Sequence, residues 1–198
     1  MYGHMILGFC GSPRSGATEY VIKEALRMIE MQGHKTEFYT IKDKEIRYCI
    51  HCDFCLQKRG CILNDDLGLL YELLKEAEGI IIGSPVYNGG ITAQTKTVLD
   101  RTRALVAADP KVFEGKKGIA VAIGGDRIGG QELAIQQIIN FYLLNGIIPL
   151  NGGFFGANIG ATFWSKDTLD GVKEDEEGFR TLRKTIKRFI EYLQVKDA

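Results

Sequence analysis

Short apolar runs alternate along this chain with stretches whose apolar residues recur every three or four positions. The runs at 5–10 (MILGFC), 79–83 (GIIIG) and 117–125 (KGIAVAIGG) are typical of strands buried on both faces of a parallel sheet. Segment 36–41 alternates like a strand, and 147–155 supplies a fifth strand. The pattern therefore predicts five strands.

Helical periodicity fills the intervals between these strands. The first helix follows residue 18 and has an apolar stripe at Val21, Ile22, Ala25, Leu26 and Ile29. A second helix is predicted to be capped by Asp65 or Asp66 and buried through Leu67, Leu70, Leu73, Leu74 and Ala77. Two more are predicted over about 92–107 and 131–145. The last predicted helix has an apolar face from Phe179 to Leu193.

Strands that alternate with helices predict an α/β fold with a parallel sheet between two helical layers. Five strands and five helices suit the doubly wound order 2-1-3-4-5. No repeat or linker interrupts the pattern, so residues 1–198 are predicted to form one domain. An irregular loop at about 47–64 carries most of the cysteines.

Composition and charge narrow the function classes. Lys+Arg and Asp+Glu both number 25, which gives no electrostatic reason to expect nucleic acid or an anionic membrane as a partner. No apolar run approaches the 18 residues of a membrane span. The N-terminus lacks the pattern of a secretory signal. We therefore expect a cytoplasmic protein whose cysteines are metal ligands rather than disulfides.

Four of the five cysteines lie in residues 49–61 (CIHCDFCLQKRGC), at Cys49, Cys52, Cys55 and Cys61. Their C-x2-C-x2-C-x5-C spacing has a longer last gap than the bacterial ferredoxin run and no proline after it. Soft thiolates at this density favour one [4Fe–4S] cluster held by all four, and structural zinc is the alternative.

The segment between the first strand and the first helix, 11–18 (GSPRSGAT), is rich in small and hydroxyl residues. In an open α/β sheet such a segment holds an anion, because the N–H groups at the helix start are free and the helix dipole is positive there. The segment matches neither an ATP-binding loop nor a dinucleotide fingerprint. A monophosphate such as that of FMN fits the hydroxyls of Ser12, Ser15 and Thr18 and the guanidinium of Arg14.

Two further glycine-containing loops are expected at the same sheet edge. They are residues 85–90 (PVYNGG), after the third strand, and 124–130 (GGDRIGG), after the fourth. In the order 2-1-3-4-5 these loops converge with the first one at the point where such sheets bind ligands. Glycines let the backbone approach a flat ring closely, although ordinary turns use the same residues.

Three segments together resemble a known family. GSPRSGAT, SPVYNGGITAQTKTVLDR at 84–101 and the cysteine run resemble the iron–sulfur flavoproteins of anaerobes, a branch of the NADPH-dependent FMN reductase-like group with a flavodoxin-like α/β/α sandwich fold. The resemblance covers about the whole chain. The first two segments are shared with FMN reductases that have no cluster, so the cysteine run is what identifies the branch.

This resemblance implies an FMN-dependent oxidoreductase with one FMN and one [4Fe–4S] cluster per chain. It implies a homodimer or homotetramer, in which the cluster lies near a flavin across a subunit interface. It further implies ferredoxin as the electron donor and oxygen or hydrogen peroxide as acceptors. No catalytic side chain is assigned, since the redox chemistry belongs to the cofactors.

Carried over by position, the resemblance assigns roles to three groups of residues. The phosphate would be held by Ser12, Arg14, Ser15, Gly16, Ala17 and Thr18, the flavin ring by Pro85, Val86, Tyr87, Asn88, Gly89, Gly124, Gly125 and Asp126, and the cluster by Cys49, Cys52, Cys55 and Cys61. Lys96, Asp100 and Arg101 also match the family pattern, and are expected to orient their helix or an interface.

Two other functions remain open at this level. One is a reductase of FMN or quinones that takes hydride from NAD(P)H and holds a structural metal at the cysteines. The other is a redox-sensing or scaffold protein whose cysteines bind zinc.

Overall fold

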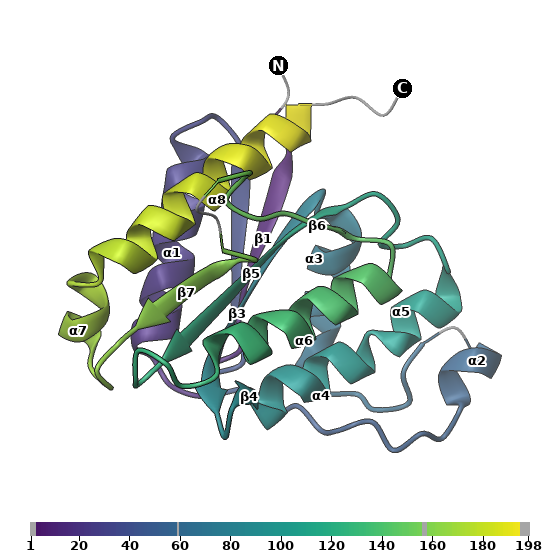
Figure 1. The fold of residues 1–198 in the computed structure, drawn as a ribbon. Helices are drawn as coiled ribbons and strands as arrows, with labels where there is room; N and C mark the ends of the chain where they lie inside the picture. The colour runs from purple at the N-terminus through teal and green to yellow at the C-terminus, as the bar shows by residue number, and fades with distance from the viewer. Residues whose placement is uncertain (1–2, 59, 156–157, 195–198) are drawn as a thin grey trace.

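The computed structural model describes residues 3–58, 60–155 and 158–194 (Figure 1). Within these ranges seven strands form one sheet: β1 (Met5–Cys10), β2 (Lys35–Thr40), β3 (Gly79–Tyr87), β4 (Gly90–Ile91), β5 (Lys117–Gly124), β6 (Ile148–Pro149) and β7 (Ala161–Trp164). The main order is β2-β1-β3-β5-β6, while β4 pairs with β3 and β7 pairs with β5. All of these pairs are parallel except β3 with β4.

Helices cover both faces of this sheet, as the α/β prediction requires (Figure 1). The described helices are α1 (Ala17–Glu30), α2 (Phe54–Lys58), α3 (Leu67–Glu76), α4 (Ala93–Arg101), α5 (Arg103–Ala108), α6 (Gln131–Leu144), α7 (Leu169–Lys173) and α8 (Glu176–Gln194). Helices α1, α7 and α8 pack on one face, and α3 to α6 on the other. None of the described helices is long and apolar enough to span a membrane.

The core follows from the alternation of side chains along the central strands. Ile80 and Ile82 of β3 face α3 to α6, whereas Ile81 between them faces α1 and α8. All three are buried, which is why these strands read as continuous apolar runs. The predicted stripe of the first helix is confirmed, because its five apolar residues are all buried.

The fifth strand differs from the prediction. Residues 147–155 were expected to form it, but only Ile148–Pro149 pair with β5, beside Lys117 and Gly118. The chain then leaves the sheet and returns as β7, which pairs with β5 from Val121 to Gly124. Two short strands, β6 and β7, therefore pair with β5 where one strand was predicted. The expected loop after this strand includes residues 156 and 157, which lie outside the described residues.

The predicted helix over 92–107 is divided at Thr102 into α4 and α5. The Thr102 hydroxyl donates to the Leu99 carbonyl (2.7 Å), and the Arg101 carbonyl accepts the Tyr71 hydroxyl (2.9 Å). A threonine side chain that takes a backbone acceptor competes with the helical ladder, which accounts for the break. The expected surface loop over 167–177 likewise contains the short helix α7.

Tyr142 offers a test of how α6 is joined to the sheet. Its ring is fully buried, and its hydroxyl donates to the carbonyls of Ile119 (2.8 Å) and Ile80 (3.2 Å). We expect Tyr142→Phe to lower the free energy of unfolding by about 1 kcal/mol, the net value of a buried hydrogen bond. Chemical denaturation measures this, with the more exposed Tyr192→Phe as the matched control. Equal effects of the two substitutions would contradict the assigned hydrogen bonds.

Candidate functional site

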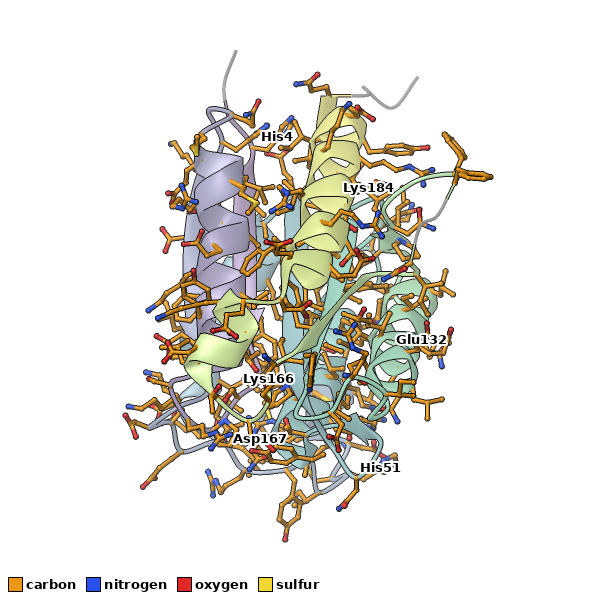
Figure 2. The ribbon with its side chains drawn as sticks, turned by 60° about the vertical axis from the view of Figure 1, so that its left-hand side comes forward. His4, His51, Glu132, Lys166, Asp167 and Lys184 are labelled. Carbon is orange, nitrogen blue, oxygen red and sulfur yellow. The ribbon has the colours of Figure 1, made fainter. Side chains whose placement is uncertain are left out.

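The carboxyl ends of β1, β3, β5 and β7 meet at one end of the sheet. Their register places Cys10 beside Gly83, Pro85 beside Ile123, and Gly124 beside Trp164. The segments that follow these strands therefore lie at one edge, as predicted. Figure 2 shows Lys166 and Asp167, which follow β7, at the same end of the molecule as His51 of the cysteine segment, and His4 at the opposite end.

Residues 11–16 connect β1 to α1 in a tight turn. The Ser12 hydroxyl donates to the Arg14 carbonyl (2.7 Å) and accepts the Arg14 N–H (3.3 Å). Helix α1 begins after Gly16 with no side-chain cap, so the N–H groups of its first turn have no acceptor in the helix. Arg14 and Ser15 are exposed beside them. This arrangement suits a phosphate group.

A cavity of about 490 Å³ opens beside this turn. It brings together four of the six residues predicted to hold phosphate: Arg14, Ser15, Gly16 and Ala17. The other two, Ser12 and Thr18, are buried behind them and are not in its lining. Lys23 adds a second cation to the cavity, and Glu19 adds a carboxylate.

The opposite wall of this cavity was missed in the sequence. It is formed by Ser165, Asp167 and Thr168, which follow β7. The N–H and hydroxyl of Ser165 both donate to the Gly124 carbonyl (2.8 and 3.1 Å), so this segment is tied to the end of β5. The alternating ATFW at 161–164, followed by S-x-x-T, was the available signal that another strand ends at this edge.

The predicted loop after the third strand is largely a β-hairpin. Pro85, Val86 and Tyr87 remain in β3, which pairs antiparallel with β4. Asn88 and Gly89 form the two-residue turn, with φ of 50° and 79°. Positive φ at both turn positions matches the twist of a tight hairpin, which is why the strand continues through the expected loop. The exposed Tyr87 and Asn88 stand at its tip.

Gln131 organises the loop after β5, another role that the sequence did not reveal. Its side chain is buried, accepts the Gly129 N–H (2.8 Å) and donates to the carbonyls of Asp126 (2.5 Å) and Phe163 (3.3 Å). Asp126 is thus held by its backbone and its side chain is exposed. The loop also contacts the hairpin, because a side chain at Gly130 would come within 2.7 Å of the Gly89 backbone.

Buried hydroxyls join the phosphate turn to the hairpin and to α4. Thr92 and Thr95 both donate to the Gly11 carbonyl (2.9 and 3.2 Å), and the Thr92 N–H donates to the Ser84 hydroxyl (3.1 Å). Gly11 is required here, because a Cβ would lie 1.9 Å from the Thr95 hydroxyl. The start of α4 therefore fixes the backbone from which the phosphate turn departs.

The four clustered cysteines line one cavity, whose remaining wall comes from α4 and α5. All four are free thiols: Cys49 and Cys52 precede α2, Cys55 lies within it, and Cys61 follows it. In the described chain no three His, Cys, Asp or Glu side chains are close enough to hold a single ion. Cys10 lies elsewhere, in the core, where burial raises the pKa of its thiol to about 11. Arg59 of the cysteine run lies outside the described residues.

A buried ion pair closes the cysteine segment. Arg101 Nη1 lies 2.8 Å from Asp65 Oδ2, and Nη2 lies 3.1 Å from Asp65 Oδ1. Arg101 also donates to the carbonyls of Arg47 (2.6 Å) and Leu63 (3.3 Å), on either side of the cysteines. Burial would raise the pKa of the Asp65 carboxyl, but Arg101 and the N–H groups of Arg47 and Leu67 outweigh it and hold that pKa below its usual range.

Of the three family-pattern residues on α4, two form an exposed pair: Lys96 Nζ lies 2.5 Å from Asp100 Oδ1. The third, Arg101, lines the cysteine cavity, as does Arg103 of α5. Arg103 Nη2 lies 2.7 Å from Asp53 Oδ1 and its pKa is raised, first by that hydrogen bond and also by the nearby thiols of Cys55 and Cys49. Two arginines thus stand at the wall of the cysteine cavity.

The cysteine cavity and the phosphate turn lie at opposite ends of α4. Thr92, before the first residue of this helix, bonds the phosphate turn, and Arg101, its last residue, lines the cysteine cavity. Nine helical residues extend over about 13 Å. The segment after β2 does start at the ligand-binding edge, but it carries the cysteines outward, past α4, to the α4–α5 junction.

Comparison with known proteins agrees with this geometry. The profile described as NADPH-dependent FMN reductase matches residues 5–162. The chain is 64% identical to an iron–sulfur flavoprotein of Archaeoglobus fulgidus, over 96% of this chain and 97% of that protein. It is 49% identical to an iron–sulfur flavoprotein of Methanocaldococcus jannaschii, over 96% of this chain and 98% of that one.

A solved structure with the same fold is the apo form of the NADH:FMN oxidoreductase EmoB, with a TM-score of 0.67 and 18% identity over 98% of this chain and 91% of that one. At this identity the likeness confirms the predicted α/β fold and nothing finer. The family match and the identities carry the assignment. This chain therefore belongs to the NADPH-dependent FMN reductase family, as one of its iron–sulfur flavoproteins, and is an FMN-dependent oxidoreductase.

Proposed function

We propose that this oxidoreductase passes electrons between a [4Fe–4S] cluster held by Cys49, Cys52, Cys55 and Cys61 and an FMN bound at the carboxyl edge of the sheet. The observation that carries the proposal is the shared cavity of the four thiols, in a chain whose sheet edge also offers a phosphate turn. Four cysteines are the usual ligand set of such a cluster. The names of the similar iron–sulfur flavoproteins support the same centre.

The FMN would be held by the residues that surround the sheet edge. Its phosphate would accept the free N–H groups at the start of α1 and the Arg14 guanidinium, with Ser15 and Thr168 as hydroxyl donors on the two walls. Its ring would lie against the hairpin tip at Asn88 and the loop at 124–126. Gln131 keeps that loop in shape through its three carbonyl contacts and one N–H contact.

FMN exchanges two electrons and a cluster exchanges one at a time, so together they connect one-electron donors with two-electron acceptors. The residues of the chain would hold the two cofactors in position. The Arg101–Asp65 pair keeps both ends of the cysteine segment together, and the hydroxyls of Thr92 and Thr95 fix the phosphate turn. We propose ferredoxin as the donor, and oxygen or hydrogen peroxide as the acceptor.

A second candidate is a reductase that draws hydride from NAD(P)H, with the cysteines holding a structural metal. The family match favours it, because the matching profile is named for NADPH-dependent reduction of FMN. The two candidates use the same flavin edge and differ in the electron donor. The donor therefore decides between them.

We also propose that the working form is a homodimer or homotetramer. Large apolar side chains are exposed on and beside α6, including Ile128, Leu133 and Leu144. Leu144 lines a cavity together with Tyr87 and Asn88 of the hairpin tip and with Asp100 of α4, which also lines the cysteine cavity. A second copy seated on this surface would cover apolar area between the flavin edge and the cysteines.

The ligand assignment is tested by Cys52→Ser in anaerobically purified protein. Removing one of four thiolate ligands should abolish the cluster, seen as loss of iron, acid-labile sulfide and the broad visible absorption. FMN content should stay at the wild-type level, because the phosphate turn is at the other end of α4. Cys10→Ala is the matched control and should retain both cofactors. Full iron and sulfide in the serine variant would refute Cys52 as a ligand, and zinc without sulfide in the wild type would refute the cluster.

The donor is tested by anaerobic stopped-flow reduction of the holoprotein. Reduced ferredoxin should bleach the cluster and flavin absorption at a rate that falls with rising ionic strength, whereas NADPH at the same concentration should reduce the flavin far more slowly. Cys52→Ser should lose the ferredoxin reaction selectively. Fast reduction by NADPH that survives this substitution would favour the reductase alternative.

Assembly is tested by sedimentation equilibrium of wild type and Leu144→Glu. Leu144 is 87% exposed, and a carboxylate there would be left in an apolar interface without a partner. We expect a multiple of the chain mass for wild type and a smaller mass for the variant. Met31→Glu, which alters an exposed apolar side chain at the end of α1 on the other face of the sheet, should keep the wild-type mass. Identical masses for all three proteins would remove α6 from the interface.

A further inference from the structure

Arg101 has one N–H group that nothing in the described chain accepts. A guanidinium carries five N–H groups. Its four Nη hydrogens are matched by four contacts, two with the Asp65 carboxylate and one each with the Arg47 and Leu63 carbonyls. The fifth, on Nε, has no acceptor within the described residues, and the side chain is only 1% exposed. Water therefore has little access to it.

Buried polar groups of native proteins are almost always hydrogen-bonded, and an exception calls for a missing partner. The position of the Arg101 Nε–H in the fold indicates which acceptor is missing. Arg101 lines the cavity that the four cysteines share. The carboxylates that line the same cavity already have cations: Asp53 pairs with Arg103, and Asp100 with Lys96. Among the polar side chains of this lining, the four cysteines are the ones without a charged partner within the described residues.

We propose that Arg101 Nε–H donates a hydrogen bond to a sulfur of the metal centre in the cavity that the four cysteines line. Arg101 is thus a positioning residue that joins the centre to the closed cysteine segment. The inference rests on the cluster proposed above. Hydrogen bonds to the sulfurs of such a centre favour its reduced, more negative state and so raise its reduction potential.

The geometry also explains why the residue is arginine. All four Nη hydrogens are used by Asp65 and the two carbonyls, and the fifth donor of the planar guanidinium, Nε–H, is left over. A lysine has no fixed fork of donors of this kind. It could neutralise Asp65 or reach a sulfur, but not hold both ends of the segment while donating to the cavity.

The inference is tested in wild-type protein grown with arginine that carries ¹⁵N at Nε. After reduction of the cluster, pulsed electron paramagnetic resonance (HYSCORE) should detect a weakly coupled ¹⁵N nucleus. The coupling should persist in labelled Arg103→Lys, which alters the other arginine at the cavity, and disappear in Arg101→Lys. A reduced wild-type cluster without ¹⁵N coupling, or coupling that vanishes in Arg103→Lys, would overturn the inference and leave the proposed function intact. A wild-type protein without iron and sulfide would instead overturn both.

Redox titration gives a second measurement that a merely structural role would not match. Arg101→Lys should shift the cluster midpoint potential to more negative values, because one donor to sulfur is lost. Asp65→Asn should shift it to more positive values, because the Arg101 charge is then no longer balanced by a carboxylate. Shifts of the same sign, or none, would contradict a hydrogen bond from Arg101. Where either variant fails to hold iron, the ¹⁵N experiment on wild type decides.

Discussion

The cysteine segment depends on the buried ion pair between Asp65 and Arg101. The segment leaves the core after β2 and must return to begin α3, and this pair holds both ends at one point through Arg47, Leu63 and Asp65. Removing one partner of a buried pair costs about 3–5 kcal/mol, because the other charge is stranded. An exposed pair such as Lys96–Asp100 contributes about 0.3–0.5 kcal/mol. The difference identifies the pair that determines the shape of this segment.

Helix α4 connects the two sites because each of its ends is held by polar contacts rather than by apolar packing alone. At its start, the Thr92 hydroxyl accepts the Thr95 N–H as a cap and donates to the Gly11 carbonyl. At its end, Arg101 joins the walls of the cysteine cavity. Because both ends of this helix are held, its length sets the separation between the phosphate turn and the cysteines. The electron transfer proposed above would benefit from such a fixed separation.

The sequence predicted most of the fold, but not the contacts that shape the sheet edge and the cysteine segment. Buried strands and the stripe of α1 are local patterns, and they appear in the structure as predicted. The four clustered cysteines line one cavity, and their role as cluster ligands stays a prediction. The division of the last strand is not local, since β6 and β7 are set by which part of β5 each can pair with. Gln131 and Ser165 likewise act through carbonyls of segments distant in sequence. Arg101 matched a family pattern, yet its partner Asp65 is 36 residues away.

The charges around the cysteine cavity are arranged as pairs rather than as a free positive patch. Arg101 is balanced by Asp65 and Arg103 by Asp53, so the wall adds almost no net charge to a chain that is itself neutral. Both arginines line the cavity, as Asp53 does, whereas Asp65 is not part of the lining. Two unpaired arginines at this wall would repel each other in the absence of a metal centre. A wall without charged side chains would not stabilise four thiolates. Paired arginines avoid both problems, because each arginine at the wall keeps a carboxylate beside it, and the carboxylate of Asp65 also accepts the backbone N–H groups of Arg47 and Leu67.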